Sequence, residues 1–177
     1  MPNTDGHGIP LPRAAAQSKV PRIVHEIAAV SDRPELAPIV AAWLVDAFGY
    51  EGGRTVDQMT ALILAPPKGP EETFVLLDQG RPVGTASLAH ADLAARPDLT
   101  PWLAGVFVEP ASRGLGYATA LVRCVEAFAS AASVPALWLY TWTAEPLYAR
   151  LGWHRVGLEK DRDQTVVLMT RRLSDRF

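Results

Sequence analysis

The sequence has little of what several large classes of protein require. Its single cysteine cannot form an intrachain disulfide, and such usage is typical of a reducing compartment. Its apolar runs are far shorter than the roughly 20 residues that cross a bilayer, and its first residues lack a basic start followed by an apolar core. Lysine and arginine form neither a stripe nor a tail, and the formal net charge is −2. We therefore expect a cytoplasmic protein that binds neither nucleic acid nor a membrane.

Two common phosphate-binding motifs and metal-ligand spacings are also missing. A P-loop needs a Gly-Lys pair, which occurs nowhere in the sequence. A dinucleotide fingerprint needs glycine or alanine where this chain has Thr119, and an acidic residue at the end of the next strand, where it has Thr141. No spacing of His, Cys and Asp residues is typical of a metal site, so we expect no metal.

The chain has the size and composition of one domain with a packed core. It has 177 residues, and 49% of them are hydrophobic. Residues 1–20 hold prolines and glycines and few large apolar side chains. We therefore predict a flexible N-terminal tail over residues 1–20 and a single domain over residues 21–177.

The most informative stretch is WLAGVFVEPASRGLGYATALVRCVEAFASAA, residues 102–132. Residues 103–108 form an apolar run with little alternation, which is typical of a strand covered on both faces. Pro110 cannot donate a ladder hydrogen bond, so the strand should end just before it. Apolar residues then recur at helical spacing over residues 115–132, with Glu126 on the opposite, polar face. The stretch predicts a buried strand, a short loop and a long helix.

The loop between this strand and this helix is suited to a phosphate. A helix N-terminus has unpaired backbone N–H groups and about half a positive charge. Gly114 and Gly116 let an anion approach the backbone without meeting a Cβ, and Arg113 adds a cation. The small Ala118 keeps the first helical turn open to a bulky ligand. We predict a pyrophosphate site here.

Periodicity and the placing of glycine and proline predict the remaining elements. Their order is one strand, two helices, three strands, a helix, a strand, a helix and two strands. The other predicted strands span residues 22–29, 73–77, 83–88, 136–140, 153–158 and 165–169. The other predicted helices begin near Ser31 or Asp32, near Thr55 and near Ala144.

Two motifs in this order resemble those of one enzyme family. The first is Arg-x-x-Gly-x-Ala, residues 113–118, between a buried strand and a long helix. The second is Leu-Tyr-Ala-Arg-Leu-Gly-Trp, residues 147–153. Together with the order of elements over residues 22–172, they resemble the GCN5-related N-acetyltransferase (GNAT) superfamily, in its small bacterial form. The resemblance implies an α/β fold with a mixed, mostly antiparallel sheet, helices on both faces and splayed central strands.

The resemblance also implies a donor, acetyl-CoA, and the residues that hold it. The backbones of Val106, Phe107 and Val108 match the positions that meet the pantetheine arm. The loop that matches the pyrophosphate site comprises Arg113, Gly114, Leu115, Gly116, Tyr117, Ala118 and Thr119.

Tyr148 matches the general acid of the family, which protonates the departing thiolate of coenzyme A. Some relatives have a glutamate early on the central strand as the base, but residues 102–105 contain no carboxylate. An asparagine that usually lies seven residues before the tyrosine is Thr141 here, which removes one expected contact to coenzyme A. The base stays open among His90, Asp92, Asp98 and a water chain.

The implied acceptor is a primary amine of a small molecule or a peptide. Aromatic residues that could line its pocket are Trp43, Phe48, Tyr50, Trp102, Trp138 and Trp142. Of these, Trp102 and Trp142 lie at predicted strand ends and are the favoured pocket residues, with Asp98 in a neighbouring loop. Because the chain has no strong acidic patch, a single amine is favoured over a polycation such as an aminoglycoside.

Two other functions stay open. One is a catalytically silent GNAT module that binds acyl-CoA and regulates a partner. The other is a dinucleotide-binding domain, which Thr119 and Thr141 disfavour. The oligomeric state is also open, with a homodimer as one arrangement.

Overall fold

The computed structural model describes residues 25–173, so the predicted tail, residues 1–20, lies outside the described residues. The predicted order of elements is confirmed. The strands are β1 (His25–Ala29), β2 (Glu72–Asp78), β3 (Arg81–Ala89), β4 (Trp102–Val108), β5 (Ala136–Thr141), β6 (His154–Asp161) and β7 (Gln164–Arg172). The helices are α1 (Ala37–Phe48), α2 (Val56–Ile63), α3 (Tyr117–Ala131) and α4 (Glu145–Arg150), with short 3₁₀ turns at Pro34–Leu36 and Pro110–Ser112.

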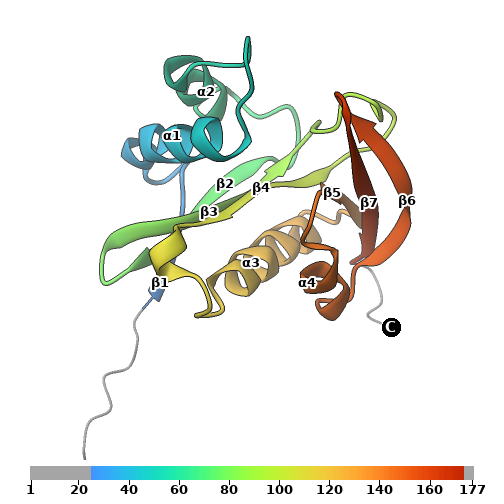
Figure 1. The fold of residues 1–177 in the computed structure, drawn as a ribbon. Coiled ribbons are helices and arrows are strands. Elements are labelled where there is room, and N and C mark those ends of the chain that lie inside the picture. The colour runs from blue at the N-terminus through green and yellow to red at the C-terminus, as the bar shows by residue number, and fades with distance from the viewer. Residues whose placement is uncertain (1–24, 174–177) are drawn as a thin grey trace, which may run out of the picture.

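Helices cover both faces of the sheet: α1 and α2 lie on one face, and α3 and α4 on the other (Figure 1). The larger core lies under α3 and α4, where Leu121 of α3 is buried with Leu137 and Leu139 of β5. A smaller core joins Val40 of α1 to Val75 of β2. Because side chains alternate along a strand, the central strands contribute to both cores.

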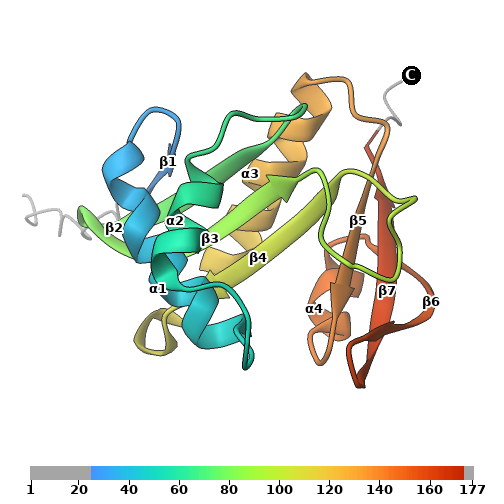
Figure 2. The ribbon, with the colours of Figure 1, turned by 90° about the horizontal axis from the view of Figure 1, so that it is seen from above.

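The sheet is open at its centre. Its strand order is β1-β2-β3-β4-β5-β7-β6, and every neighbouring pair is antiparallel except β4 and β5. These two parallel strands share one register pair, Trp102 with Trp138, near their beginnings. Beyond it they diverge, as the view in Figure 2 shows. The predicted splay of the central strands is confirmed.

A β-bulge in β4 was not predicted. Ser87 of β3 lies opposite Ala104, and Thr85 lies opposite Phe107, so β4 has one residue more than β3 over this interval. Gly105, within the bulge, has φ of +59°, which favours glycine. A Cβ at this position would lie 3.0 Å from Leu44 Cδ2 of α1. The bulge bends β4 at the height where it separates from β5, and α1 packs closely against it.

Two local predictions differ from the structure. The helix predicted to be capped by Ser31 or Asp32 begins only at Ala37, after the first 3₁₀ turn, and has no side-chain cap. The Ser31 hydroxyl instead donates a hydrogen bond to Glu72 of the neighbouring strand. The last hairpin is longer than predicted, because the polar residues 159–161 continue the exposed edge strand β6. Its turn therefore lies at residues 162–163, close to the end of α1.

Candidate active site

The loop before α3 has the geometry of an anion site. Gly114 and Gly116 have φ of +78° and +81°, and Gly116 is the N-cap of α3. A Cβ added at either glycine would meet no heavy atom within 4 Å. The first-turn N–H groups of a helix lack intrahelical partners and lie at the positive end of its dipole. Open backbone at such a terminus is a place where a phosphate can bind.

The side chains of this loop differ in what they offer. Arg113 is exposed, and its Nε donates a hydrogen bond to the carbonyl oxygen of Val108 at 3.0 Å, which holds the guanidinium at the end of β4. Leu115 is exposed, and Ala118 and Thr119 are half-buried. Tyr117 is buried, and its ring centroid lies 5.7 Å from that of His25. Of Tyr117, therefore, only the backbone faces the loop.

The gap between β4 and β5 leaves part of one strand without a partner. Among the described residues, no register pair joins these strands after Trp102 and Trp138. Val106 and Phe107 are half-buried, while Val108 is buried. Backbone N–H and C=O groups away from water need hydrogen-bond partners. The edge of β4 over residues 106–108 is therefore suited to a ligand that carries amide groups.

Tyr148 lies on α4, on the same face of the sheet as α3. Its side chain is buried, and its ring meets Trp153 edge-on with centroids 6.2 Å apart. Burial raises the pKa of the Tyr148 hydroxyl to about 12, so it keeps its proton throughout the neutral range. The turn before α4 is fixed by Thr141, whose Oγ1 accepts a hydrogen bond from the Ala144 N–H at 2.9 Å. Thr141, which replaces the asparagine expected from the family, therefore has a local structural role in this turn.

A buried carboxylate supports the segment behind Tyr148. Glu126 was predicted on the polar face of its helix, and this was wrong: it is 6% exposed. It accepts a hydrogen bond from Trp153 Nε1 at 2.9 Å and pairs with Arg123 at 2.7 Å and Arg171 at 3.2 Å. A Cβ at Gly152 would collide with the Arg171 guanidinium. This network holds the end of α4 against α3 and β7, and no sequence signal pointed to it apart from the Arg-Glu spacing on one helix.

Asp92 has the most perturbed acidity of the three predicted base candidates. It lies in the loop between β3 and β4 and is exposed, although protein atoms lie close around its carboxyl. This desolvation, together with the negative charge of Asp161, raises the pKa of the Asp92 carboxyl to about 7. Both carboxylates also lie near Tyr140 of β5, and burial, with their charges, raises the pKa of its hydroxyl.

The structure gives the other two candidates different surroundings. Asp98 forms a two-pronged ion pair with Arg96, with distances of 2.9 and 2.8 Å, and this pair lowers the pKa of its carboxyl. Arg96 also bonds Glu159 of β6 at 2.9 Å, so the β3–β4 loop is tied to the far edge of the sheet. His90 is exposed and lies beside Thr100, 3.3 Å from its hydroxyl. None of the three candidates, His90, Asp92 and Asp98, lines the cavity at the end of α1.

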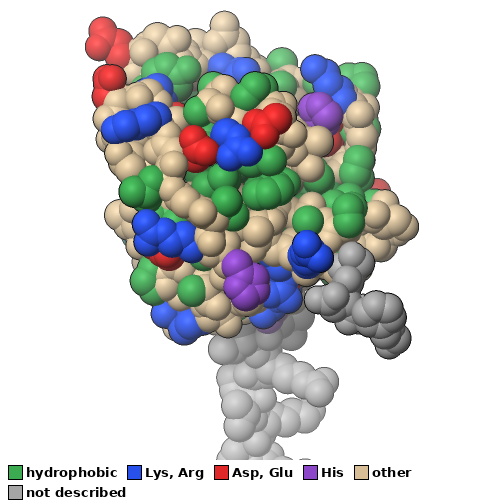
Figure 3. All heavy atoms as spheres, turned by 90° about the vertical axis from the view of Figure 1, so that its right-hand side faces the viewer, with side chains coloured by type: hydrophobic (Ala, Val, Ile, Leu, Met, Phe, Trp, Pro, Cys, Tyr) green, Lys and Arg blue, Asp and Glu red, His purple; other side chains and the backbone are tan. Residues whose placement is uncertain are grey.

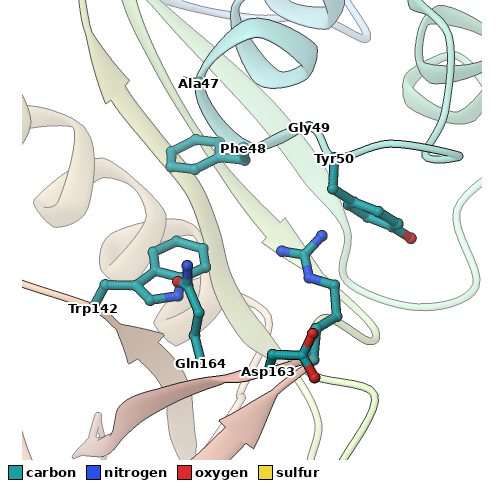
Figure 4. Close-up of a pocket in the computed structure, with 8 residues that line it drawn as sticks. Ala47, Phe48, Gly49, Tyr50, Trp142, Asp163 and Gln164 are labelled. Atoms are coloured by element: carbon teal, nitrogen blue, oxygen red, sulfur yellow. The ribbon is translucent and has the colours of Figure 1, made fainter.

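A cavity of about 390 Å³ lies where the end of α1 faces the end of β5 and the β6–β7 turn (Figure 4). Its lining comprises Ala47, Phe48, Gly49, Tyr50, Trp142, Arg162, Asp163 and Gln164. Trp142, one of the predicted pocket residues, thus lines it. The residues of the β6–β7 turn were not predicted, because a polar turn gives no sequence signal for what it faces across the fold.

Trp102, the other predicted pocket residue, is fully buried. Its Nε1 donates a hydrogen bond to the Leu99 carbonyl at 2.8 Å, and its ring meets Tyr140 edge-on. It belongs to a core cluster with Leu93, Val166 and other apolar side chains that underlies the cavity. A residue at a strand end is expected to be exposed only where no loop covers it. Here the β3–β4 loop covers Trp102.

Among residues 25–173 there is no group of three or more His, Cys, Asp or Glu side chains that could hold a metal ion. None of the helices in that range is long and apolar enough to cross a membrane.

The mixed sheet is open between β4 and β5, and a glycine loop precedes α3. These two features define an acetyltransferase fold. A model of the Acetyltransferase (GNAT) family matches residues 38–153, and the chain belongs to this family. The predicted resemblance is confirmed. The mixed sheet also differs from the doubly wound parallel sheet of dinucleotide-binding domains.

Solved structures of acetyltransferases share the fold. An aminoglycoside 6'-N-acetyltransferase complexed with coenzyme A is 16% identical, with a TM-score of 0.69 over 85% of this chain and 98% of that chain. The aminoglycoside 6'-N-acetyltransferase from Enterococcus faecium is 16% identical, with a TM-score of 0.68 over 85% and 98%. The protein yncA from Salmonella typhimurium, with its cofactor acetyl-CoA, is 16% identical, with a TM-score of 0.63 over 87% and 95%. No curated protein matches the chain. Identities this low show the fold alone.

Proposed function

We propose that this protein transfers an acetyl group from acetyl-CoA to a primary amine of a small molecule or a peptide. The observation that carries the proposal is the open N-terminus of α3. It lies directly beside the end of β4, where β4 has diverged from β5. One extended ligand with a phosphate group and a chain of amides fits both features. Coenzyme A has this chemistry, and two of the similar structures contain coenzyme A or acetyl-CoA.

The residues present fit such a donor. The space in front of Gly114 and Gly116 contains no protein atom within 4 Å of where a side chain would begin, so a pyrophosphate can approach the backbone. Arg113 places a positive charge at the same loop. The free edge of residues 106–108 can exchange hydrogen bonds with the amides of a pantetheine arm. The bound donor supplies the activated acetyl group as a thioester.

Tyr148 is proposed to act on the departing sulfur. A thiol has a reference pKa of about 8.5, so a tyrosine hydroxyl with a pKa of about 12 is the weaker acid, and full proton transfer to a thiolate is uphill. A hydrogen bond from the hydroxyl to the sulfur still favours the developing negative charge. Burial matters here because it keeps the hydroxyl protonated and limits competition from water.

Asp92 is proposed as the group that takes a proton from the amine, directly or through water. An alkylammonium group has a pKa of about 10.4 and must lose a proton before it can attack. A carboxyl with a pKa of about 7 is partly ionised at neutral pH and is a stronger base than an ordinary aspartate. The proposed base and acid lie on opposite faces of the sheet. Leu139 of β5 points into the core under α3 and α4, where Tyr148 also lies. Because neighbouring side chains on a strand point to opposite faces, Tyr140 points to the other face, and Asp92 lies near Tyr140.

Two measurements test the proposal. In thermal unfolding, a ligand at a hundred times its Kd adds about 2.7 kcal/mol, which raises the melting temperature by several degrees in a chain of this size. We expect coenzyme A and acetyl-CoA, but not NAD, to have this effect. Free-thiol release from acetyl-CoA should then depend on an added amine. Stabilisation by NAD alone would refute the proposal, and coenzyme A binding without thiol release from any amine would support a silent module.

A further inference from the structure

The cavity at the end of α1 is the feature from which the acceptor can be inferred. Three segments that are distant in the sequence meet there: the end of α1, the residue after β5 and the β6–β7 turn. Its volume of about 390 Å³ is at the lower end of the roughly 300–1,000 Å³ typical of ligand pockets. It therefore suits a small molecule.

The cavity has an aromatic wall. The rings of Phe48 and Trp142 are nearly parallel, with an interplanar angle of 16° and centroids 6.2 Å apart. Figure 4 shows these two rings together, with Gln164 beside the indole. Trp142 Nε1 is buried and has no hydrogen-bond partner within residues 25–173, so it can donate to a ligand. Flat apolar groups pack favourably on such a wall.

The charges around the cavity are of both signs. The Arg162 guanidinium lies 4.0 Å from the centroid of the Tyr50 ring, and it pairs with Asp161 at 3.1 Å. This contact places a cation between the β6–β7 turn and the segment after α1. Asp163 is the one carboxylate among the lining residues. Asp92 does not line the cavity, but it lies near Tyr140 and Asp161, which are close in sequence to the lining residues Trp142 and Arg162. On the side of the molecule drawn in Figure 3, acidic and basic side chains are interspersed rather than gathered by sign.

We propose that this cavity binds the acceptor and that it selects a primary amine with one flat apolar group, such as an aromatic ring. The ring packs on Phe48 and Trp142, which form one wall of the cavity. Arg162 is paired with Asp161, so the preference rests on the aromatic wall and not on charge repulsion. This inference rests on the proposed function and names the class of its acceptor.

Thiol release with matched amines tests the inference. Phenethylamine and n-butylamine each have one primary amine and differ in the ring, while spermidine and kanamycin are polycations. We expect kcat/KM for phenethylamine to exceed that for n-butylamine by about tenfold, the scale of one good aromatic contact. Spermidine and kanamycin carry no flat apolar group, so both should also be poorer acceptors than phenethylamine. The readout is the ratio between amines, which does not depend on the fraction of enzyme that is folded.

Variants locate the source of this ratio. Trp142→Leu and, independently, Phe48→Leu should each remove most of the preference for phenethylamine. Phe128→Leu is the matched control, because Phe128 lies on α3 and packs against Phe74 on the other face of the sheet.

The outcomes separate this inference from the function on which it rests. If n-butylamine or kanamycin is the better acceptor, or if both wall variants keep the wild-type ratio, the inference is refuted while the acetyltransferase function stands. If no amine in the panel releases thiol although coenzyme A binds, both are refuted.

Discussion

Replacing Asp92 by asparagine removes the proposed base while keeping nearly the same shape. Asp92 is an exposed residue, but protein atoms around its carboxyl and the charge of nearby Asp161 raise its pKa to about 7 from the ordinary 3.8. If Asp92 accepts the proton of the amine, kcat should follow the ionised fraction of this carboxyl. The asparagine variant should lose about 10²-fold or more in kcat, the lower end of the usual contribution of a general base.

The pH profile follows from the same pKa. With a pKa of about 7, the carboxyl is about one tenth ionised at pH 6 and about nine tenths ionised at pH 8. In wild type, kcat should therefore rise about tenfold per pH unit below the inflection and level off above it. An ammonium group bound beside the carboxylate lowers its pKa, so the inflection in kcat should lie at or below 7.

Stability should change in the opposite sense to activity. Because folding raises the pKa of Asp92, the folded state binds more protons between about pH 4 and pH 7, and this contribution to stability is lost as pH rises through that range. Asparagine cannot ionise, so the variant should melt at a higher temperature than wild type at pH 8. The gain should be smaller at pH 5, and contact with solvent limits its size.

The assay is steady-state thiol release from pH 5.5 to 9 with saturating phenethylamine, alongside thermal unfolding at pH 5 and pH 8. Asp98→Asn makes the same chemical change at a carboxylate whose pKa Arg96 holds low, so it should leave the inflection in place. A wild-type kcat and pH profile in folded Asp92→Asn would refute the reasoning and leave the base to His90 or to water.

The other predictions concern the acid, the loop and the buried carboxylate. Tyr148→Phe keeps the ring and its packing, so kcat should fall about 10²-fold while acetyl-CoA affinity in calorimetry stays nearly constant; an unchanged kcat would assign Tyr148 a packing role only. Gly116→Val should weaken coenzyme A binding at least tenfold. The control is Gly80→Val, because Gly80 is a turn glycine with φ of +80° and equally open space. This variant should impose similar backbone strain but leave the affinity for coenzyme A unchanged. Equal affinities would place the phosphate elsewhere. Glu126→Ala should cost roughly 3 kcal/mol in urea unfolding, because Trp153 Nε1 and two arginines lose their partner, and a loss near zero would contradict the proposed support of α4.

The sequence alone determined the order of elements and the position of the glycine loop before α3. Both depend on signals within a few residues of each other. Helical spacing from Leu115 onward, with glycines at positions 114 and 116, specifies a helix with an open N-terminus, whatever the rest of the chain does. The same holds for Thr55, which forms the capping box of α2 with Gln58, and for the glycine-bearing turn between β2 and β3.

Only the tertiary structure decided which polar groups are exposed and which are paired. Glu126 has the spacing of a solvent-facing residue, yet Trp153 and Arg171 cover it from later in the chain. Asp98 and Asp92 are similar in sequence context, but Arg96 makes one an ordinary ion-paired carboxylate while surrounding protein makes the other a weak acid.

The bulge at Gly105 and the cavity beside Trp142 belong to this second group. A bulge exists only relative to the partner strand, because its extra residue is counted against β3. The cavity exists only because the end of α1 and the β6–β7 turn, separated by most of the chain, lie side by side. Such features depend on contacts between distant residues, and neither periodicity nor local conformational preference specifies those contacts.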